Sequence, residues 1–345
     1  MLCVLLLTLF RWAYLYRRFT IEAAEGTLRQ TNFYEKIKPN PPPIKVLGKS
    51  TTDVDSVSAE KLDKIRKILA KNTELREITS EPDPDSVLIL TPIKDSAEYL
   101  DRYFSLIDRL DYPRSSISIA FLVSDSIDKM QQILVQKQKQ YQQDGPEEQR
   151  FNQFEIYRQD FFYILSHRQR HDFKMQRERQ TMRALKDEQW VIWIDGDLEE
   201  YPPTIIKDLM AYDKDIIVPA CMENRTKAGG PIRHTLYDHN AWQETDVSRK
   251  MLAGLKDTDF LAEDTKYIRS GRRYMDEFKN EEIVPLDGIG GTFALVKSHV
   301  HRSGVVFPTW LVEHEVETEG FAKLAKLNGF GVYGLPSYHV IHVRS

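Results

Sequence analysis

The sequence predicts an α/β fold in which a mostly parallel central sheet carries helices on both faces. Apolar segments of strand length alternate along the chain with segments whose apolar residues recur at helical spacing. The strand-like segments are apolar on both faces, as in a sheet that is covered from both sides. The chain has 345 residues, 41% of them hydrophobic and 29% charged, which is enough for one large α/β domain or two smaller ones.

The first 85 residues are predicted to precede this fold. Residues 1–19 are mostly apolar, end in arginines and carry aromatic residues typical of a membrane interface, which favours a membrane anchor over a soluble apolar N-terminus. Because a span needs about 20 residues, either this anchor is short or its start is truncated. Residues 20–85 are predicted to form a stem or linker with a polyproline run. The arginines after the anchor would by themselves leave the body in the cytoplasm.

The elements of the body follow from residue 86. Strands are predicted at 86–91, 116–126, 152–160, 190–195 and 215–220. Helices are predicted at 96–110, 127–140 and 203–212, and an exposed loop at 136–150. This alternation is the signature of strand–helix–strand units, which build parallel sheets.

The second part of the body is less regular in sequence. Residues 221–285 are polar and contain Gly229-Gly230, which predicts a mobile loop and a second lobe. Apolar residues return at 287–297 and 329–343, with a helix predicted across 315–328. We therefore divide the body, 86–345, into a first half at 86–220 and a second half at 221–345.

The strand at 190–195 runs into Asp195-Gly196-Asp197. Alternate residues of a strand point to one side, so both carboxylates are expected to face the same way at the sheet edge where α/β proteins bind ligands. Carboxylates this close repel each other unless a cation or a shared proton intervenes. Oxygen ligands suit Mn²⁺ or Mg²⁺ held between protein and phosphate. The alternative is a hairpin turn in which Asp197 caps a helix, but the order of strand, acidic turn and helix favours the metal.

Two other classes of function are disfavoured. A phosphatase with an Asp-x-Asp nucleophile carries its pair near the start of the fold, followed closely by Thr or Val, whereas here several strands and helices precede the pair and Leu198 and Glu199 follow it. A nucleic-acid-binding protein needs a basic excess to neutralise phosphates, and this chain has a net charge of −4.

Polar side chains also follow the first two strands at the same predicted edge. Lys94 and Asp95 come after the first strand, and Ser124 and Asp125 come after the second. Successive strand ends are where a nucleotide lies in such a fold, although capping of the next helix is the alternative at each position. Residues 168–183 are dense in arginine, and we predict that one or two of these contact a diphosphate while the rest form a solvated helix face.

The second half supplies four further candidates. Asp287 precedes a flexible glycine turn, Glu317 and Glu319 lie near a helix start, and His342 lies in the last strand. Each has a structural alternative. Asp287 would lie in a turn without a ligand, the two glutamates would interact favourably with the helix dipole, and His342 would be a structural histidine. His342 becomes a candidate ligand only if its strand returns to the Asp195–Asp197 turn.

Together these segments resemble the fungal mannan-polymerase α-mannosyltransferases, glycosyltransferase family 62, over residues 86–343. The motifs that carry the resemblance are ILTPIKDSAEYL, AFLVSDS, RHDF, WVIWIDGDLEEYPPTIIKDLMAYDKDIIVP, YDHNAW, DGIGGTFALVK, ETEGF and YGLPSYHVIHV. The resemblance implies a GT-A type fold, with a donor-nucleotide half at 86–220 and an acceptor half at 221–345. It also implies GDP-mannose as the donor and Mn²⁺ as the cofactor, with Mg²⁺ as the alternative.

The resemblance also assigns residues to roles. The implied metal ligands are Asp195, Asp197 and His342. The implied donor-binding residues are Thr91, Pro92, Asp95, Ser124, Asp125 and Arg179. The implied catalytic residues are Asp195, Asp197, Asp287 and Glu319, and the implied acceptor-side residues are Asn240 and Glu317. One departure concerns the segment before the Asp195 strand, which is shorter than the family's Ala/Arg/Asn-rich helix and lacks its Asn.

The implied activity is a metal-dependent, retaining transfer of mannose from GDP-mannose to mannose on the outer chains of N-glycans, with an α-1,6 linkage. The alternative is a non-catalytic subunit of a mannan polymerase complex, which the shortened segment favours. The implied partners are a mannosylated glycan acceptor and related mannosyltransferase subunits in a hetero-oligomer, with no nucleic acid. The resemblance further implies a single-pass type II protein of the Golgi membrane with a luminal body, where Asn224 would lie in a glycosylation motif.

Overall fold

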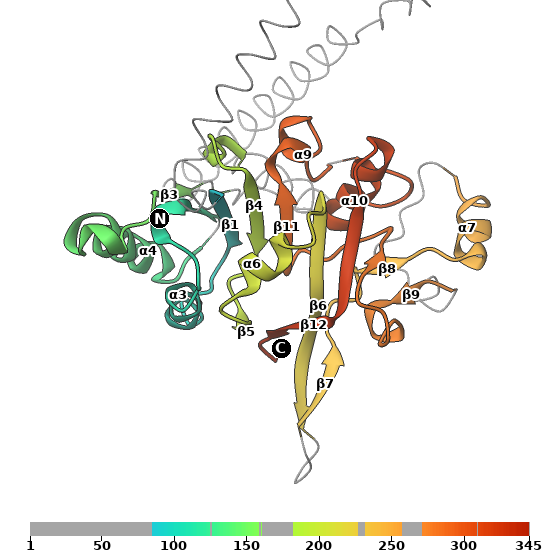
Figure 1. Cartoon of the computed structure of the whole chain (residues 1–345), viewed down its shortest axis with the longest axis horizontal. Coiled ribbons are helices and arrows are strands. Elements are labelled where there is room, and N and C mark those ends of the chain that lie inside the picture. Colours follow the sequence, from blue (N-terminus) through green and yellow to red (C-terminus); the bar gives the residue numbers. More distant parts are fainter. Residues whose placement is uncertain are drawn as a thin grey trace, which may run out of the picture. The chain divides into compact units, whose positions relative to one another are not determined.

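A ten-stranded mixed sheet organises the part of the chain that the structure describes (Figure 1). The structure is a computed structural model that describes residues 85–124, 126–158, 160, 182–226, 232–256, 271–308 and 310–344. These residues all belong to one compact unit, Glu81–Ser345. The predicted anchor, nearly all of the stem, Asp125 and Arg179 lie outside the described residues. No helix in the described ranges combines the length and the apolar character that a membrane span requires.

The first half of the sheet is parallel throughout. Its strands lie in the order β3-β2-β1-β4, which are Gln153–Arg158, Ile117–Val123, Val87–Ile93 and Trp190–Ile194. Every residue of β1, β2 and β4 is buried except Pro92, as expected for strands that are covered on both faces. The carboxyl ends of these strands therefore meet at one edge of the sheet.

The order continues from β4 through β11, β6, β12 and β10, which are Phe293–Lys297, Ile216–Thr226, Val332–His342 and Val284–Pro285. Strand β11 runs antiparallel to both of its neighbours, whereas β6 and β12 pair in parallel. The short β5, Leu198–Glu200, pairs with the end of β12. The predicted α/β class with a mostly parallel central sheet is thus confirmed. The reversal of β11 could not be predicted, because an apolar pattern carries no strand direction.

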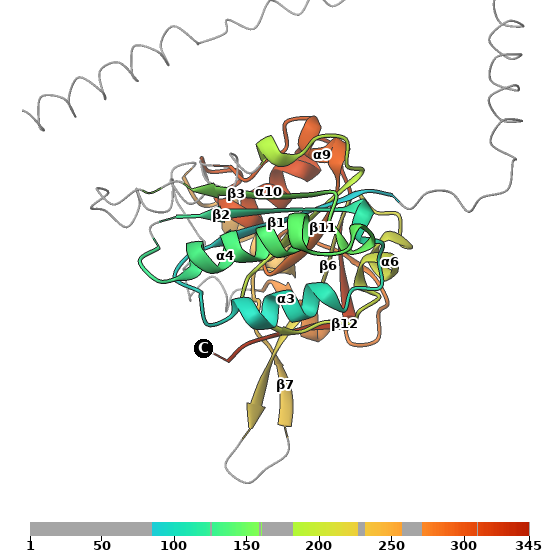
Figure 2. The ribbon, with the colours of Figure 1, turned by 90° about the vertical axis from the view of Figure 1, so that its left-hand side faces the viewer.

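Helices cover both faces of the sheet, as predicted (Figure 2). One face packs against α3, α4 and α6, which are Leu100–Asp108, Met130–Lys139 and Ile205–Met210. The other face packs against α9 and α10, which are Ser298–Arg302 and Glu317–Leu327. Alternate strand residues enter the two cores: Ile192 belongs to the first core, with Phe104, and Trp193 to the second, with Phe321.

Residues 221–285 contain more regular structure than predicted. Strand β6 continues through the predicted division of the body at residue 220. The other elements of this segment are β7 at Ile232–Leu236, β8 at Trp242–Gln243, α7 at Asp246–Leu252, β9 at Arg273–Tyr274 and β10. Single-turn helices in the chain lie at Arg114–Ser116, Gln140–Asp144, Glu147–Gln149, Met182–Ala184 and Met275–Glu277. The prediction of an irregular segment was wrong for these residues because their strands are short and polar.

Candidate active site

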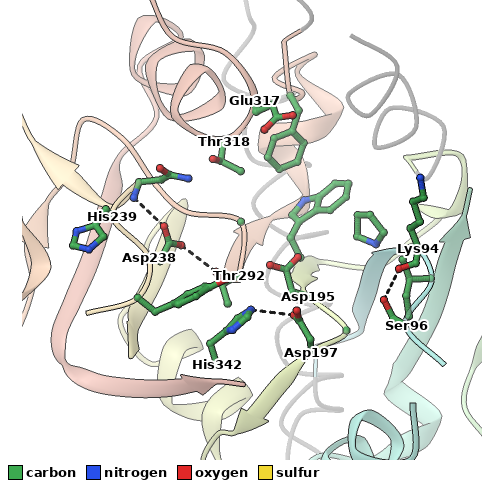
Figure 3. Close-up of a pocket in the computed structure, with 18 residues that line it drawn as sticks. Lys94, Ser96, Asp195, Asp197, Asp238, His239, Thr292, Glu317, Thr318 and His342 are labelled. Carbon is green, nitrogen blue, oxygen red and sulfur yellow. Dashed lines mark hydrogen bonds and ion pairs between the residues drawn. The ribbon is translucent and has the colours of Figure 1, made fainter. Parts of the chain in front are cut away.

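The Asp195-Gly196-Asp197 turn is held from both sides at the carboxyl end of β4. The Asp195 amide donates to the Thr292 carbonyl at 3.0 Å, and the Val343 amide donates to the Asp197 carbonyl at 3.1 Å. Both carboxylates line one cavity of about 690 Å³ (Figure 3). The two carboxylates thus face the same way, as predicted, but strand β4 ends at Ile194, so strand alternation is not the cause. The turn, pinned by β11 and the C-terminal segment, brings them to the cavity instead.

Gly196 allows β1 to approach this turn closely. A Cβ at position 196 would lie 3.0 Å from the Ile93 side chain, which is closer than ordinary van der Waals contact. The glycine therefore provides space against the neighbouring strand, at the position between the two carboxylates.

His342 reaches the same turn from the end of β12. Its Nε2 lies 3.2 Å from Asp197 Oδ1, and its Nδ1 donates to the Val343 carbonyl at 2.6 Å. The Tyr237 ring stacks on the imidazole at 3.8 Å between centroids with a 14° interplanar angle. Burial disfavours the charged imidazole, but the hydrogen bonds to Asp197 and Val343 and the nearby carboxylates outweigh it, so the pKa of His342 is raised.

The donor set at this turn fits a divalent cation that is shared with a substrate. Among the described residues, no three His, Cys, Asp or Glu side chains are grouped closely enough to hold a metal by themselves. The predicted three-residue site is therefore not preformed, and His342 is paired with Asp197. Two carboxylates in one cavity still suit a hard cation that takes its other ligands from substrate phosphates and water. The Nδ1 bond of His342 leaves Nε2 facing Asp197, where it can hold a proton or serve as a ligand.

Asp238 supplies a further carboxylate to the cavity, which sequence reasoning missed. Its Oδ2 accepts from the Thr292 hydroxyl at 3.1 Å and its Oδ1 accepts from the Asn240 amide at 2.9 Å. Burial raises the pKa of Asp238, and these hydrogen bonds only partly offset that effect. The sequence signal was present in YDHNAW, but a lone Asp after a short polar strand resembles an ordinary turn.

Gly290 is required for the position of Asp238. A Cβ added at residue 290 would lie 1.4 Å from Asp238 Oδ2. We expect Gly290→Ala to displace the Asp238 carboxylate from Thr292 and to lower the free energy of unfolding by about 1–3 kcal/mol, the usual cost of overpacking. Urea unfolding of the purified protein measures this. Gly254→Ala is the control, because its added Cβ would meet only ordinary contact at 3.4 Å; equal stability of the two variants would contradict the prediction.

An apolar wall of the cavity comes from Trp193 and Phe307, whose rings meet edge to face at 4.8 Å. The Trp193 indole donates to His301 Nε2 at 3.0 Å, and His301 Nδ1 lies 2.9 Å from the Val305 carbonyl, to which it donates. Both nitrogens of a neutral imidazole are thereby satisfied. Burial lowers the pKa of His301 to about 4, and the Val305 bond offsets this only in part.

His301 predicts an acid sensitivity of folding. Its pKa is depressed in the folded state relative to about 6.5 in the unfolded chain. The unfolded chain therefore binds more protons between pH 6.5 and 4, and stability is lost as the pH falls through this window. The unfolding free energy of the unchanged protein should fall between pH 6.5 and 4, and in His301→Phe this fall should be smaller by up to about 3 kcal/mol. Urea unfolding at several pH values measures it, and an unchanged slope would contradict it.

Six of the residues predicted from the sequence line this cavity together: Pro92, Asp195, Asp197, Asn240, Glu317 and His342. Lys94 also lines it. Residues that sequence reasoning missed are Trp193, Tyr237, Asp238, Thr292, Phe307 and Thr318. Most of the missed residues come from aromatic core positions or from loops of the second half, whose approach to β4 depends on the tertiary fold.

Three predicted donor-binding residues belong to the scaffold rather than to the cavity lining. Thr91 is fully buried, and its hydroxyl lies 2.8 Å from the Tyr103 hydroxyl. Asp95 accepts from the Ile127 amide at 2.8 Å and thereby joins the ends of β1 and β2. Ser124 is also fully buried. These three residues shape the strand ends and are not part of the cavity lining; their contact with the donor stays a prediction.

Two predicted catalytic carboxylates also lie outside the lining of this cavity. Asp287 accepts from the Glu244 amide at 2.8 Å, forms an ion pair with Lys326 and lines a second cavity. Glu319 is buried, and its pKa is raised by burial and by the neighbouring Glu315 carboxylate. The predicted catalytic role of Asp287 and Glu319 therefore has no support in the geometry. The position of Glu319 near a helix start did not reveal, from the sequence, which way its side chain faces.

Comparison with known proteins gives a consistent set of relatives. Residues 69–311 match the Anp1 family. The chain is 36% identical over 293 residues to the mannan polymerase complex subunit mnn9 of Schizosaccharomyces pombe, covering 78% of this chain and 84% of that protein. It is 32% identical over 277 residues to the mannan polymerase II complex ANP1 subunit of Saccharomyces cerevisiae, covering 75% of this chain and 55% of that protein.

Solved structures with a similar arrangement are more distant. The mannosyltransferase PcManGT from Pyrobaculum calidifontis, in complex with GDP-Man and Mn2+, is 10% identical with a TM-score of 0.42, covering 81% of this chain and 65% of that one. GalNAc-T7 with UDP, GalNAc and Mn2+ is 11% identical with a TM-score of 0.48, covering 76% and 45%. These likenesses are too distant to support a function.

Proposed function

The chain belongs to the Anp1 family, and from this membership and the cavity at the end of β4 we propose that it is a mannosyltransferase-type subunit of GT-A type. The relatives that support this are named as subunits of mannan polymerase complexes. The single observation that carries an enzymatic role is the pair Asp195 and Asp197, which face one cavity of about 690 Å³ together with His342. Its volume suits a small-molecule site.

We propose GDP-mannose as the donor and a mannosylated glycan as the acceptor. Asp195 and Asp197 would hold a Mn²⁺ or Mg²⁺ ion at the donor diphosphate, with His342 as a further ligand. When bound, that ion neutralises the charge that develops on the departing diphosphate. Trp193 and Phe307 provide an apolar wall that limits water at the reacting centre. The carboxyl group of Asp238 and the hydroxyl of Thr292 present hydrogen-bonding groups to sugar hydroxyls in the same cavity.

The transfer breaks the bond between the mannose anomeric carbon and the phosphate oxygen and forms a bond from that carbon to an acceptor hydroxyl oxygen. The hydroxyl proton passes to the leaving phosphate. This front-face route retains the α configuration through an oxocarbenium-like state. It requires no protein general base, and we assign none. An α-1,6 linkage is part of the proposal.

Incubation of the purified protein with GDP-mannose, Mn²⁺ and α-mannobiose tests this function. We expect a trisaccharide product whose linkage is α-1,6 by methylation analysis, and no product when EDTA replaces Mn²⁺. Absence of product with every acceptor, alone and with co-expressed Anp1-family subunits, would overturn the enzymatic proposal.

A non-catalytic subunit of a mannan polymerase complex is the second candidate. It is favoured by the names of the relatives as complex subunits and by a metal site that is not preformed among the described residues. Calorimetry with GDP-mannose and Mn²⁺ distinguishes the two, since the enzyme must bind the donor. In either case we propose hetero-oligomers with related subunits, detectable by co-purification.

We also propose that the protein is a single-pass type II protein of the Golgi membrane with a luminal body. The apolar stretch at 1–19 supports this proposal. Protease protection of the body in intact Golgi vesicles is the expected result.

A further inference from the structure

A second cavity of about 790 Å³ lies beside α7 and α10. One part of its wall is apolar and consists of Leu252, Ala253, Leu255 and Leu311. The rest is polar and consists of Glu244, Arg249, Asp287, Glu313, His314 and Lys323. A cavity of this volume, with one apolar surface and several converging polar groups, has the form of a small-molecule site.

The polar groups of this second cavity are held in place by one another. Lys323 Nζ lies 3.4 Å from Glu244 Oε1 and 3.3 Å from Glu313 Oε2. Glu244 and Lys323 are each only 6% exposed, and the Glu244 amide donates to Asp287 at 2.8 Å. Side chains fixed in this way offer a ligand hydrogen-bonding groups that lose little entropy on binding.

The charges favour a neutral ligand with many hydroxyl groups over an anion. Lys323 is paired with two carboxylates, and Arg249 lies 3.0 Å from Asp246. In the described lining, the lysine and the arginine thus already have carboxylate partners. A phosphate or nucleotide would have to compete with these carboxylates for the same cations, and would also face Asp287 and Glu313. A saccharide can donate to the carboxylates and accept from the cations at the same time.

The turn between Val312 and Glu315 places two of these side chains at a conformational cost. Glu313 and His314 have φ values of 48° and 72°, although neither is glycine. A backbone in this region is strained for any residue but glycine and persists only where surrounding contacts impose it. Here the reciprocal amide–carbonyl bonds of Val312 and Glu315, at 2.8 and 3.0 Å, impose it. Both strained residues line the second cavity.

The same segments line both cavities. Three segments each contribute one residue to the first cavity and one to the second. These pairs, with the residue of the first cavity given first, are Asn240 and Glu244, Gly291 and Asp287, and, on α10, Thr318 and Lys323. Four residues of extended chain span at most about 14 Å, and five residues of helix span about 7.5 Å. The two cavities are therefore separated by a distance that a few linked sugars can bridge.

We propose that the second cavity binds the acceptor oligosaccharide, a few sugar units away from the hydroxyl that reacts in the first cavity. This inference rests on the proposed mannosyl transfer. It identifies the part of the protein that distinguishes a long acceptor chain from a short one, by binding neutral sugar units through Glu313, Arg249 and Asp287.

Acceptor length tests the proposal. Initial rates are measured with α-mannobiose and α-mannopentaose for the full chain and for Glu313→Gln and Arg249→Gln, two residues whose side chains are at least half exposed. Glu148→Gln, an exposed carboxylate on a single-turn helix away from both cavities, is the matched control. We expect the KM for the pentasaccharide to rise about tenfold in both cavity variants, as for loss of one charged hydrogen bond. The KM for the disaccharide should change less than twofold.

Direct binding supplies a second readout. Saturation-transfer NMR of α-mannopentaose is measured with the Asp197→Asn protein. We expect protein contacts at sugars beyond the two at one end of the chain. Adding Glu313→Gln to this protein should weaken those contacts. A pentasaccharide KM equal to that of the disaccharide in the unchanged protein, or an unaltered pentasaccharide KM in both variants, would overturn the subsite. Failure of transfer to either acceptor would instead reject the proposed function.

Discussion

Asp197→Asn is expected to reduce mannosyl transfer by at least about 100-fold, the scale on which loss of a key electrostatic contact acts on a transition state. Asparagine keeps the size of the side chain and can still contact His342, but it removes the negative charge that a divalent cation requires. The effect should appear in kcat/KM with GDP-mannose, and donor binding by calorimetry should lose its dependence on Mn²⁺.

The fold should survive this change, because Asp197 lies in a turn and its backbone bond to Val343 remains. We expect a Tm within about 2 °C of the unchanged protein, which corresponds to roughly 1 kcal/mol for a chain of this size. Asp111→Asn is the control, since Asp111 pairs with Lys207 at the surface and lines neither the first nor the second cavity. Full turnover by Asp197→Asn would reject a catalytic role for the Asp195–Asp197 turn.

Arg272→Met is expected to destabilise the fold strongly, with a loss of about 3–5 kcal/mol in the free energy of unfolding. The Arg272 side chain is 4% exposed and pairs with Glu315, which is fully buried. Its guanidinium also lies 3.5 Å from the centroid of the Trp242 ring. Methionine would fill similar volume but would leave the carboxylate of Glu315 buried without its main partner.

Chemical unfolding of Arg272→Met measures this effect. Lys207→Met is the control, because the Lys207–Asp111 pair has a comparable 2.9 Å distance but both side chains are more than half exposed; it should cost less than about 1 kcal/mol. The double variant Arg272→Met/Glu315→Met should recover part of the loss, since removing both partners of a buried pair is often tolerated. Equal losses in the two single variants would show that burial does not govern the Arg272 pair.

The regular part of the fold could be predicted because its strands carry their own signal. β1, β2 and β4 are apolar on both faces, and each predicted strand lies within a few residues of the observed one. The same holds for the long helix α10. In the second half, β8, β9 and β10 are two-residue strands. Their existence depends on pairing partners rather than on local pattern, so no sequence period could reveal them.

The residues of the candidate site also fall into two groups, those with a signal in the local sequence and those whose position depends on the tertiary fold. The acidic turn after β4 was visible because it interrupts an apolar strand. His342 was named as a ligand only through the resemblance, since its approach to Asp197 depends on the pairing of β12 with β5. Asp238 was missed and Asp287 misplaced for one reason: a carboxylate in a polar loop has no periodicity to indicate which cavity it faces. The glycines at 290 and 291 were interpreted as flexible, whereas they provide space for Asp238 and Thr318.

The reversed direction of β11 has a consequence for how such chains can diversify. Because this strand enters the sheet at the end where β4 finishes, the loop that precedes it reaches the first cavity through Thr292. Its other end, at Lys297, continues directly into α9 and lies at the opposite edge beside Trp190. Lengthening the connection before Phe293 should therefore change the lining of the first cavity, whereas a loop inserted between Lys297 and α9 should leave that lining unchanged. If the proposed mannosyl transfer takes place in this cavity, laboratory evolution of new glycan preferences would do best to randomise the connection before Phe293.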